Sequence, residues 1–297
     1  MLLFRDSLES VAGVPDAVGY LFAFIFGAAI GSFLNVVIHR VPIGESIVFP
    51  NSACPNCGLA IKPYDNIPLL SWAALRGKCR NCKAPISARY IAVELLTALL
   101  FVVVYWQVGF DAFLIVALAF VASMIALIFI DAEHMILPNV ITYPLLVFSI
   151  LVRIVFPNIF AGRYINDIGW WPLIFSDGQT SILASLAGAL LGAVVGGGFL
   201  WLVGAVWKRL RGVEAMGLGD VKMMAAVGAL LGWRLTLLST FLAAFGGALI
   251  GVILISKQKD RDMQTQIPFG IFLGAGSVIA LLFGDRIITW YLSTFVY

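Results

Sequence analysis

Two aspartates stand out because of where they lie in an otherwise apolar sequence. Asp131 directly follows the run FVASMIALIFI, and Asp220 lies in the stretch MGLGDVK. A carboxylate at the edge of an apolar segment is costly to bury and is by default a candidate for function. When two carboxylates lie close together they share a proton, so the ionised one can take a proton from water while the neutral one donates to a carbonyl oxygen. This chemistry suits the hydrolysis of a peptide bond.

The residues before Asp220 fit the same chemistry. Gly217 and Gly219 allow the backbone to approach an extended substrate and to adopt φ values that other residues avoid. For either aspartate taken alone, a second interpretation is open: an interfacial side chain that caps the N-terminus of a helix. The pair taken together with the glycines favours the catalytic interpretation.

All four cysteines of the chain fall in two CxxC motifs. Cys54-Pro-Asn-Cys57 is followed, after 21 residues, by Cys79-Arg-Asn-Cys82. Two such pairs can place four thiolates around one zinc ion, and a site with four protein ligands is structural because it has no open coordination position. Disulfides are the alternative, although a reducing cytoplasm opposes them. We therefore expect one structural zinc ion per chain, which stabilises a small domain.

The elements that carry these residues are predicted to be membrane helices. Of the 297 residues, 61% are hydrophobic and 12% are charged, and a soluble domain carries about twice that charged fraction. The apolar residues form runs of about 20, the length needed to cross a hydrocarbon core, where only helices and closed barrels satisfy their own backbone. The predicted spans are 18–38, 91–108, 112–130, 139–156, 181–206, 219–233, 235–255 and 268–284.

The predicted fold class is therefore an all-α polytopic membrane protein. It has about eight transmembrane helices, with a small zinc-binding cytoplasmic domain between the first and second. The net charge of +3 is not accompanied by a basic stripe, so nucleic acid is not an expected partner.

The basic residues of the loops predict the orientation of the spans. Segment 39–90 carries seven lysines and arginines and segment 207–222 carries four, whereas 157–180 carries one. The first two segments are thus predicted to be cytoplasmic and the third external. Eight alternating spans then place both termini outside and both aspartates at the cytoplasmic face.

Glycines recur every four residues in one predicted span. Gly188, Gly192 and Gly196 follow this spacing, and Gly197 and Gly198 adjoin the last of them. Small residues at this spacing let two membrane helices approach closely. We expect this stripe to serve helix packing.

Several motifs, in order along the chain, resemble those of a known family. GLGDVK is similar to the GxGD signature of intramembrane aspartyl proteases, and DAEHMILPNVIT resembles the first-aspartate motif of bacterial type IV prepilin peptidases. The other matching stretches are GSFLNVVIHRVP (31–42), the two CxxC motifs, YDNIPLLSW (64–72), RGKCRNCKAPISARYIAVELLT (76–97) and IPFGIFLGAG (267–276). The resemblance runs almost end to end and is weak only over 157–180. Presenilin-like relatives share only the aspartates.

The resemblance implies a bifunctional enzyme of the bacterial cytoplasmic (inner) membrane. Members cut the short basic leader from prepilins and pseudopilins at the cytoplasmic face, and they serve type IV pili or type II secretion. Many members then methylate the new N-terminal amine, usually of phenylalanine, with S-adenosylmethionine. The catalytic pair would be Asp131 and Asp220, and the partners would be prepilin or pseudopilin precursors and membrane lipid.

The same resemblance divides the chain into parts. Residues 1–38 would form the first span, 39–90 the cytoplasmic four-cysteine domain associated with methylation, and 91–297 the aspartyl peptidase bundle. No Rossmann-type glycine fingerprint follows a strand in 39–90, so that mode of cofactor binding is not expected. Contacts to the cofactor or to the substrate amine are expected among polar residues in or beside the matching stretches: Glu45, Asp65, Asn66, Arg89 and Glu94.

Other functions stay open on the sequence. A transporter with intramembrane carboxylates and a regulatory zinc domain would show inverted repeats and broken helices near the bilayer midplane, whereas these aspartates are expected at one edge. A peptidase that does not methylate, or a non-enzymatic factor for pilus assembly, is the other alternative.

Overall fold

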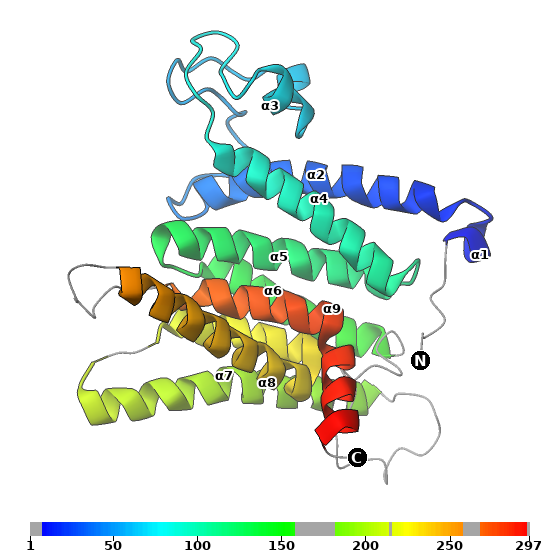
Figure 1. Ribbon diagram of the computed structural model, residues 1–297, viewed down its shortest axis with the longest axis vertical. Helices are drawn as coiled ribbons and strands as arrows, with labels where there is room; N and C mark the ends of the chain where they lie inside the picture. The colour runs from blue at the N-terminus through cyan, green and yellow to red at the C-terminus, as the bar shows by residue number, and fades with distance from the viewer. Residues whose placement is uncertain (1–7, 158–181, 214–215, 258–267, 296–297) are drawn as a thin grey trace. The chain divides into compact units, whose positions relative to one another are not determined.

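The computed structural model describes residues 8–157, 182–213, 216–257 and 268–295, and most of them are helical. The helices are α1 (Leu8–Ala12), α2 (Asp16–Arg40), α3 (Leu70–Ala74), α4 (Ala88–Val108), α5 (Phe113–His134), α6 (Asn139–Val155), α7 (Ile182–Arg211), α8 (Leu218–Lys257) and α9 (Phe269–Phe295), with a 3-10 turn η1 (Pro63–Asp65) (Figure 1). Extended pairing within the described residues is limited to two isolated β-bridges. The predicted all-α fold is confirmed.

Most of the predicted spans correspond to helices that could cross a membrane. Six described helices are long and apolar enough to do so, namely α2, α4, α5, α7, α8 and α9, and α6 is a shorter apolar helix. The sixth and seventh predicted spans both fall within α8. The count of eight spans stays a prediction. Most of the loop 157–180, predicted to be external, lies outside the described residues.

The chain forms two compact units, residues 1–126 and 127–297, and the boundary lies inside α5. Unit 1 therefore holds the predicted first span together with the four-cysteine segment. Unit 2 holds both aspartates. The predicted three-part division of the chain stays a prediction.

In unit 1, α2 and α4 lie side by side and run antiparallel (Figure 1). Glycines on α2 make the close approach possible. A Cβ on Gly27 would lie 2.8 Å from the Cα of Ala98, and a Cβ on Gly31 would lie 2.7 Å from the Cα of Glu94. The start of α4 is capped by Ser87, whose hydroxyl accepts the backbone N–H of Arg89. The cysteine segment, residues 41–87, connects α2 to α4. Its two ends are therefore held close together by the packing of these two helices.

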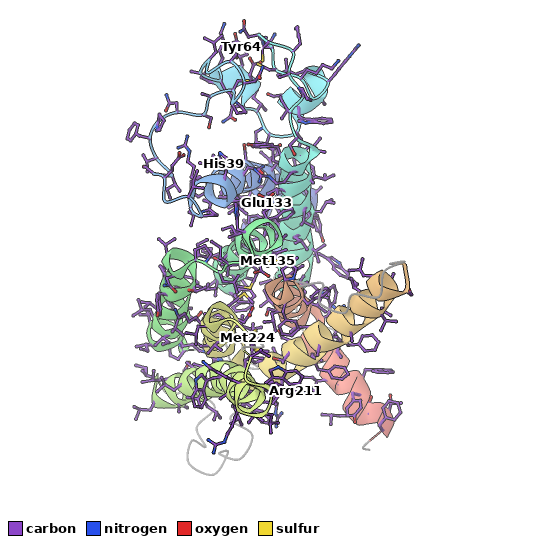
Figure 2. The ribbon with its side chains drawn as sticks, turned by 90° about the vertical axis from the view of Figure 1, so that its left-hand side faces the viewer. His39, Tyr64, Glu133, Met135, Arg211 and Met224 are labelled. Atoms are coloured by element: carbon purple, nitrogen blue, oxygen red, sulfur yellow. The ribbon has the colours of Figure 1, made fainter. Side chains whose placement is uncertain are left out.

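In unit 2, the glycine stripe of α7 packs directly against the backbone of α8. A Cβ on Gly192 would collide with the carbonyl oxygen of Gly228, and a Cβ on Gly196 would collide with that of Met224, a fully buried residue labelled in Figure 2. A Cβ on Gly197 would lie 3.0 Å from the Cβ of Ala225. These contacts confirm the expected role in close helix packing for Gly192, Gly196 and Gly197, whereas Gly198 is exposed.

One residue interrupts α8. Gly232 has φ 76° and ψ 169°, a conformation that is essentially restricted to glycine. It divides the helix into two half-helices, 218–231 and 233–257.

The two half-helices fold back on each other. Ser277 of α9 lies 3.9 Å from the sulfur of Met224 and 2.9 Å from the hydroxyl of Ser239. These two residues stand on opposite sides of Gly232 and would be about 22 Å apart in a straight helix. Because both contact one side chain, the chain must turn back at Gly232, as the two adjacent parts of α8 in Figure 1 show. The predicted spans 219–233 and 235–255 correspond to these two half-helices.

The α7–α8 contact generates a test of the fold. We expect Gly192→Ala to lower the unfolding free energy by about 1–3 kcal/mol, because the added methyl group has no space against α8. Gly198→Ala is the matched control, because Gly198 is exposed and only Val194 of its own helix lies within 4 Å of an added Cβ. Thermal unfolding of the purified proteins in detergent measures the difference. Equal midpoints for the two variants would contradict the packing described.

Candidate functional site

Asp131 lies in the last turn of α5 and is 5% exposed. The helix ends three residues later, at His134, because the next residue, Met135, has φ 54° and donates its backbone N–H to the carbonyl of Asp131. Figure 2 shows Glu133 and Met135 at this end of the helix. The Oδ2 atom of Asp131 is buried and forms no hydrogen bond with any residue that the structure describes. This carboxylate is therefore placed at a helix end with unused hydrogen-bonding capacity.

Asp220 lies in the first turn of α8, as its third residue. Its backbone N–H donates to the carbonyl of Gly217, and its carboxylate accepts the backbone N–H of Gly217. The helix N-terminus favours a negative charge at this position. The interpretation of Asp220 as a residue that satisfies a helix N-terminus is thus correct as far as this contact goes. The contact with Gly217 does not account for the position of Asp220 next to Gly270 and Asp131.

The two carboxylates meet at the backbone of Gly270, the second residue of α9. A Cβ on Gly270 would lie 2.7 Å from Oδ2 of Asp131 and 3.3 Å from Oδ1 of Asp220. The backbone N–H groups of Gly270 and Ile271 approach the Asp131 carboxylate, and such groups at a helix N-terminus stabilise an anion. Asp131 and Asp220, 89 positions apart in the sequence, therefore share one small space that only a glycine leaves open.

Gly270 was not singled out from the sequence. It lies in the stretch IPFGIF, which was noted only as part of a longer resemblance. A glycine directly after the first residue of a helix is a weak signal without knowledge of what packs against it. That Gly270 leaves space for two carboxylates is visible only from its contacts with Asp131 of α5 and Asp220 of α8.

The two glycines before Asp220 differ in their surroundings. Among the residues that the structure describes, a Cβ on Gly217 would meet the Asp220 carboxylate, at 3.5 Å, and the backbone of Gly219. A Cβ on Gly219 would lie 2.9 Å from the Cβ of Leu137. A side chain at Gly217 would therefore lie against the Asp220 carboxylate, whereas Gly219 serves the packing of α8 against the connection between α5 and α6.

The four cysteines form one cluster in unit 1. All are free, and their sulfur atoms all lie within 4.8 Å of one another. The sulfurs of Cys54 and Cys82 are 3.8 Å apart. Two ligands of a tetrahedral zinc ion lie about 3.8 Å apart when each Zn–S bond is about 2.3 Å. The donor set and its spacing therefore fit a metal ion.

The two CxxC turns are built alike. The backbone N–H of Gly58 donates to Cys54 and that of Lys83 donates to Cys79, each closing a turn of five residues. Gly58 and Lys83 both have positive φ, 69° and 60°. Each CxxC motif thus folds locally into the same hairpin-like turn, which points its two thiols to one side.

Asn56 prepares one thiol of the cluster for metal binding. Its side-chain N–H donates to the sulfur of Cys82 at 3.5 Å, and this hydrogen bond is the main cause that lowers the pKa of Cys82 to about 6. The thiolate is the form that binds a metal.

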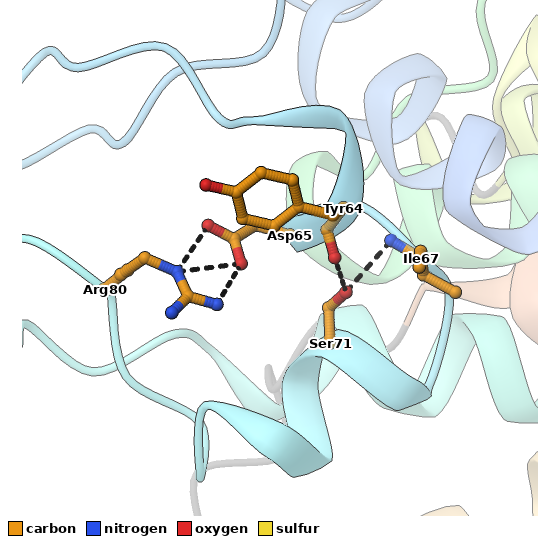
Figure 3. A network of polar contacts seen from close by, with 5 residues as sticks. All are labelled: Tyr64, Asp65, Ile67, Ser71 and Arg80. Carbon is orange, nitrogen blue, oxygen red and sulfur yellow. Dashed lines mark hydrogen bonds and ion pairs between the residues drawn. The ribbon is translucent and has the colours of Figure 1, made fainter.

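A polar network holds the rest of the cysteine segment in shape (Figure 3). Arg80, one residue after Cys79, forms a bidentate ion pair with Asp65, with contacts of 2.6 to 3.0 Å. The Arg80 guanidinium lowers the pKa of Asp65 by hydrogen bonding to its carboxylate. The hydroxyl of Ser71 donates to the carbonyl of Tyr64 and accepts the backbone N–H of Ile67. The second CxxC turn is thereby joined to η1 and α3.

A buried carboxylate joins this segment to α4. Glu94 is 8% exposed, and its Oε2 accepts the backbone N–H of Leu69 at 2.8 Å. Leu69 has φ 62° and ψ −50°, and the N–H of Leu70 donates to the carbonyl of Pro68, which closes a strained γ-turn. The hydrogen bond that the backbone N–H of Leu69 donates to Glu94 helps to hold this turn.

Asn35 lies near Glu94 at the same end of the α2–α4 pair. It is 2% exposed, and its side-chain N–H donates to the carbonyl of Tyr90 at 3.0 Å. Its Oδ1 atom is buried and has no hydrogen-bond partner among the described residues. A buried acceptor without a partner is uncommon in folded proteins.

The other residues proposed from the sequence as cofactor contacts are less enclosed. Glu45 and Asn66 are exposed. Arg89 lies with its guanidinium 5.0 Å from the ring centre of Tyr90. Asp65 is engaged with Arg80. The five residues therefore do not form a single cluster by any contact that the structure describes.

Comparison with known families covers both units. The model described as the bacterial peptidase A24 N-terminal domain matches residues 25–108, which include all four cysteines. The model of the type IV leader peptidase family matches residues 118–252, which include both aspartates.

Curated relatives match over nearly the whole chain. A protein of Aeromonas hydrophila is 38% identical, over 97% of this chain and 99% of its own length. Proteins of Pseudomonas aeruginosa and Burkholderia pseudomallei are 38% and 34% identical, over 96% and 93% of this chain and 97% and 89% of their own lengths. All three carry the name prepilin leader peptidase/N-methyltransferase. No solved structure shows a significant match.

The cysteine cluster generates a test that needs no knowledge of activity. We expect purified protein to retain about one metal ion per chain and Cys79→Ser to lose it, because three thiolates hold the ion far less tightly than four. Lys78→Ser is the matched control, since Lys78 is the exposed neighbour of Cys79. Elemental analysis by mass spectrometry counts and identifies the ion. Wild-type protein free of metal, with all four thiols protected from labelling, would exclude the site.

Proposed function

The chain belongs to the type IV leader peptidase family, and we propose that Asp131 and Asp220 are the catalytic pair with which it cleaves the leader of type IV prepilins or pseudopilins. It then methylates the new N-terminal residue, usually phenylalanine, with S-adenosylmethionine as the methyl donor. The observation that carries the proposal is the meeting of the two carboxylates at the backbone of Gly270.

The pair supports a general acid–base mechanism. One carboxylate is ionised and takes a proton from water as the water oxygen adds to the scissile carbonyl carbon. The other is protonated and donates to the carbonyl oxygen. The carbon–nitrogen bond then breaks, and a proton passes to the leaving amine. Two carboxylates this close favour a single shared proton, because both cannot ionise easily.

The surroundings of the pair fit a substrate that is itself a membrane helix. Both aspartates lie at helix ends, where a prepilin presents the bond before its apolar segment. An extended stretch of substrate would approach Asp220 beside Gly217, which has no side chain and lies next to the carboxylate. The close contact of Gly219 with Leu137 holds the start of α8, which carries Asp220, against the connection between α5 and α6.

Methyl transfer requires mostly positioning. S-adenosylmethionine, when bound, supplies an electrophilic methyl group. The new amine must lose a proton and lie in line with the carbon–sulfur bond, so that a carbon–nitrogen bond forms as that bond breaks. We place the contacts to the amine or the donor at the cytoplasmic end of unit 1, among Glu45, Asp65, Asn66, Arg89 and Glu94, together with Asn35.

Asn35 and Glu94 are the strongest members of that set. The free Oδ1 of Asn35 can accept from an amine, and the buried Glu94 carboxylate favours a positive charge nearby. Glu94 also accepts the backbone N–H of Leu69, so it holds the turn of the cysteine segment next to this end of α4.

The metal ion is proposed to be zinc with a structural role. Cys54, Cys57, Cys79 and Cys82 would complete its tetrahedron and leave no position for a substrate. Its contribution is to fold a segment of about 50 residues that is too small to rely on a core of its own. The ion takes no part in either reaction.

The location follows from the same proposal. The protein lies in the bacterial inner membrane, with the cysteine segment and the ends of α5 and α8 that carry the aspartates facing the cytoplasm, and both termini facing the periplasm. The alternatives of a peptidase without methylation and of a transporter predict no methylated product, so one assay of both reactions distinguishes them.

The catalytic pair generates a direct test. We expect Asp131→Asn and Asp220→Asn each to lower leader cleavage by at least about 10³-fold, because an amide can neither take a proton from water nor share one. Glu133→Gln is the matched control, as an exposed acid two residues after Asp131. Cleavage of purified prepilin is followed by electrophoresis. Near wild-type cleavage by either asparagine variant, in folded protein, would show the pair to be misassigned.

The separation of the two reactions generates a second test. Asp220→Asn should fail to methylate the full precursor but should still methylate a pilin whose leader has already been removed, because only the free amine is a substrate. Cys79→Ser should have the opposite pattern, with methylation reduced more than cleavage, because it damages the cysteine segment in unit 1. Mass spectrometry of the pilin N-terminus reads out both. If folded Asp220→Asn cannot methylate pre-cleaved pilin, the two sites are not separable.

A further inference from the structure

A buried arginine in α6 has no place in the proposed reactions. Arg153 is fully buried near the end of this apolar helix. A charged side chain inside a membrane-spanning bundle is costly, and it is retained where it meets a specific partner. The guanidinium donates through Nε to the carbonyl of Ala229 at 3.3 Å and through Nη2 to the carbonyl of Leu230 at 3.1 Å.

These two carbonyls belong to a helix end inside the protein. The half-helix 218–231 stops at Gly232, so its last four carbonyls, from Gly228 to Leu231, lack partners within the helix. The negative end of the helix dipole also lies there. Arg153 supplies two hydrogen-bond donors and a positive charge at this point. It therefore caps the C-terminus of the half-helix.

The other end of the same half-helix carries Asp220. Nine residues separate Asp220 from Ala229, which is about 14 Å along a helix axis. Met224 and Gly228 lie between them and press their carbonyls against the glycine stripe of α7. A short helix seated in this way moves as one piece. A shift of the half-helix along its axis would therefore also displace Asp220.

We propose that Arg153 is a positioning residue for leader cleavage: by capping the half-helix 218–231 it fixes the axial position of that half-helix and so holds Asp220 against Asp131. Arg153 acts through the half-helix, whose carbonyls it contacts. The planar guanidinium matters because it reaches two carbonyls at once, which a lysine ammonium on one flexible stem does in a less fixed way. The inference rests on the proposed roles of the two aspartates.

The test compares two substitutions of Arg153 with a control on the same helix. Arg153→Met removes the donors and the charge, and Arg153→Lys keeps the charge with a less rigid donor. Ser149→Ala is the control, because Ser149 is buried one turn earlier in α6 and donates to Leu145 of its own helix. The kcat and KM for cleavage of purified prepilin are measured, with methylation of pre-cleaved pilin as a check on the fold.

A displaced Asp220 should slow the chemical step without weakening substrate binding. We expect kcat to fall about 100-fold in Arg153→Met, the effect of a misplacement of about 1 Å, with KM within about twofold of wild type. Arg153→Lys should fall between Arg153→Met and wild type, and Ser149→Ala should match wild type. A general loss of folded enzyme would lower cleavage and methylation alike and would not respond to lysine in this graded way.

Three outcomes overturn the inference. The first is an unchanged kcat in Arg153→Met. The second is a rise in KM at constant kcat in Arg153→Met. The third is an equal loss of kcat in Arg153→Lys and in the control Ser149→Ala. If Arg153→Met does not fold, Arg153→Lys decides alone, and wild-type kcat in that variant rejects the need for a two-carbonyl cap. Failure of the proposed function is separate, since it would appear as active Asp220→Asn protein whatever the Arg153 variants do.

Discussion

Two carboxylates that repel each other occupy one small space, and the architecture of unit 2 depends on keeping them there. Asp131 and Asp220 come from different helices and meet only because Gly270 has no side chain. The N-terminal backbone of α9 faces one carboxylate, and the N-terminus of α8 binds the other. Helix ends supply partial positive charge without adding a side chain. Backbone groups at two helix ends therefore approach the two carboxylates.

The packing around this site uses glycine for two different purposes. On α7, Gly192 and Gly196 bring two helix backbones into contact, which fixes the half-helix 218–231 in place. In α8, Gly232 adopts a backbone conformation that turns the chain back on itself within one residue. A buried arginine then satisfies the helix end that this turn creates. The cysteine segment of unit 1 is stabilised in a different way. It buries few side chains and is held by the four-cysteine cluster, the ion pair of Arg80 with Asp65 and the buried carboxylate of Glu94.

Helix positions could be predicted from the sequence better than helix lengths. The apolar runs located every long helix, because a membrane span must bury its backbone and expose apolar side chains. The runs did not predict that α7 continues to Arg211 or that α9 continues to Phe295, because a helix persists into polar or aromatic residues once its backbone hydrogen bonds are formed. The two spans predicted on either side of residue 234 correspond to the two half-helices of α8, but the apolar pattern did not identify Gly232 as the residue at which the chain turns back.

The sequence by itself determined the chemical groups: two aspartates at the ends of apolar runs, and four cysteines whose spacing folds locally into two matching turns. Only the tertiary structure decided which backbone the aspartates share, what Gly219 packs against and where the charge of Arg153 is used. The physical reason is the range of the interactions. The CxxC turns are closed by hydrogen bonds between residues four apart, which a local pattern records. The contacts of Gly270 with Asp131 and of Arg153 with Ala229 join residues far apart in the chain, and they exist only after helix packing has brought those residues together.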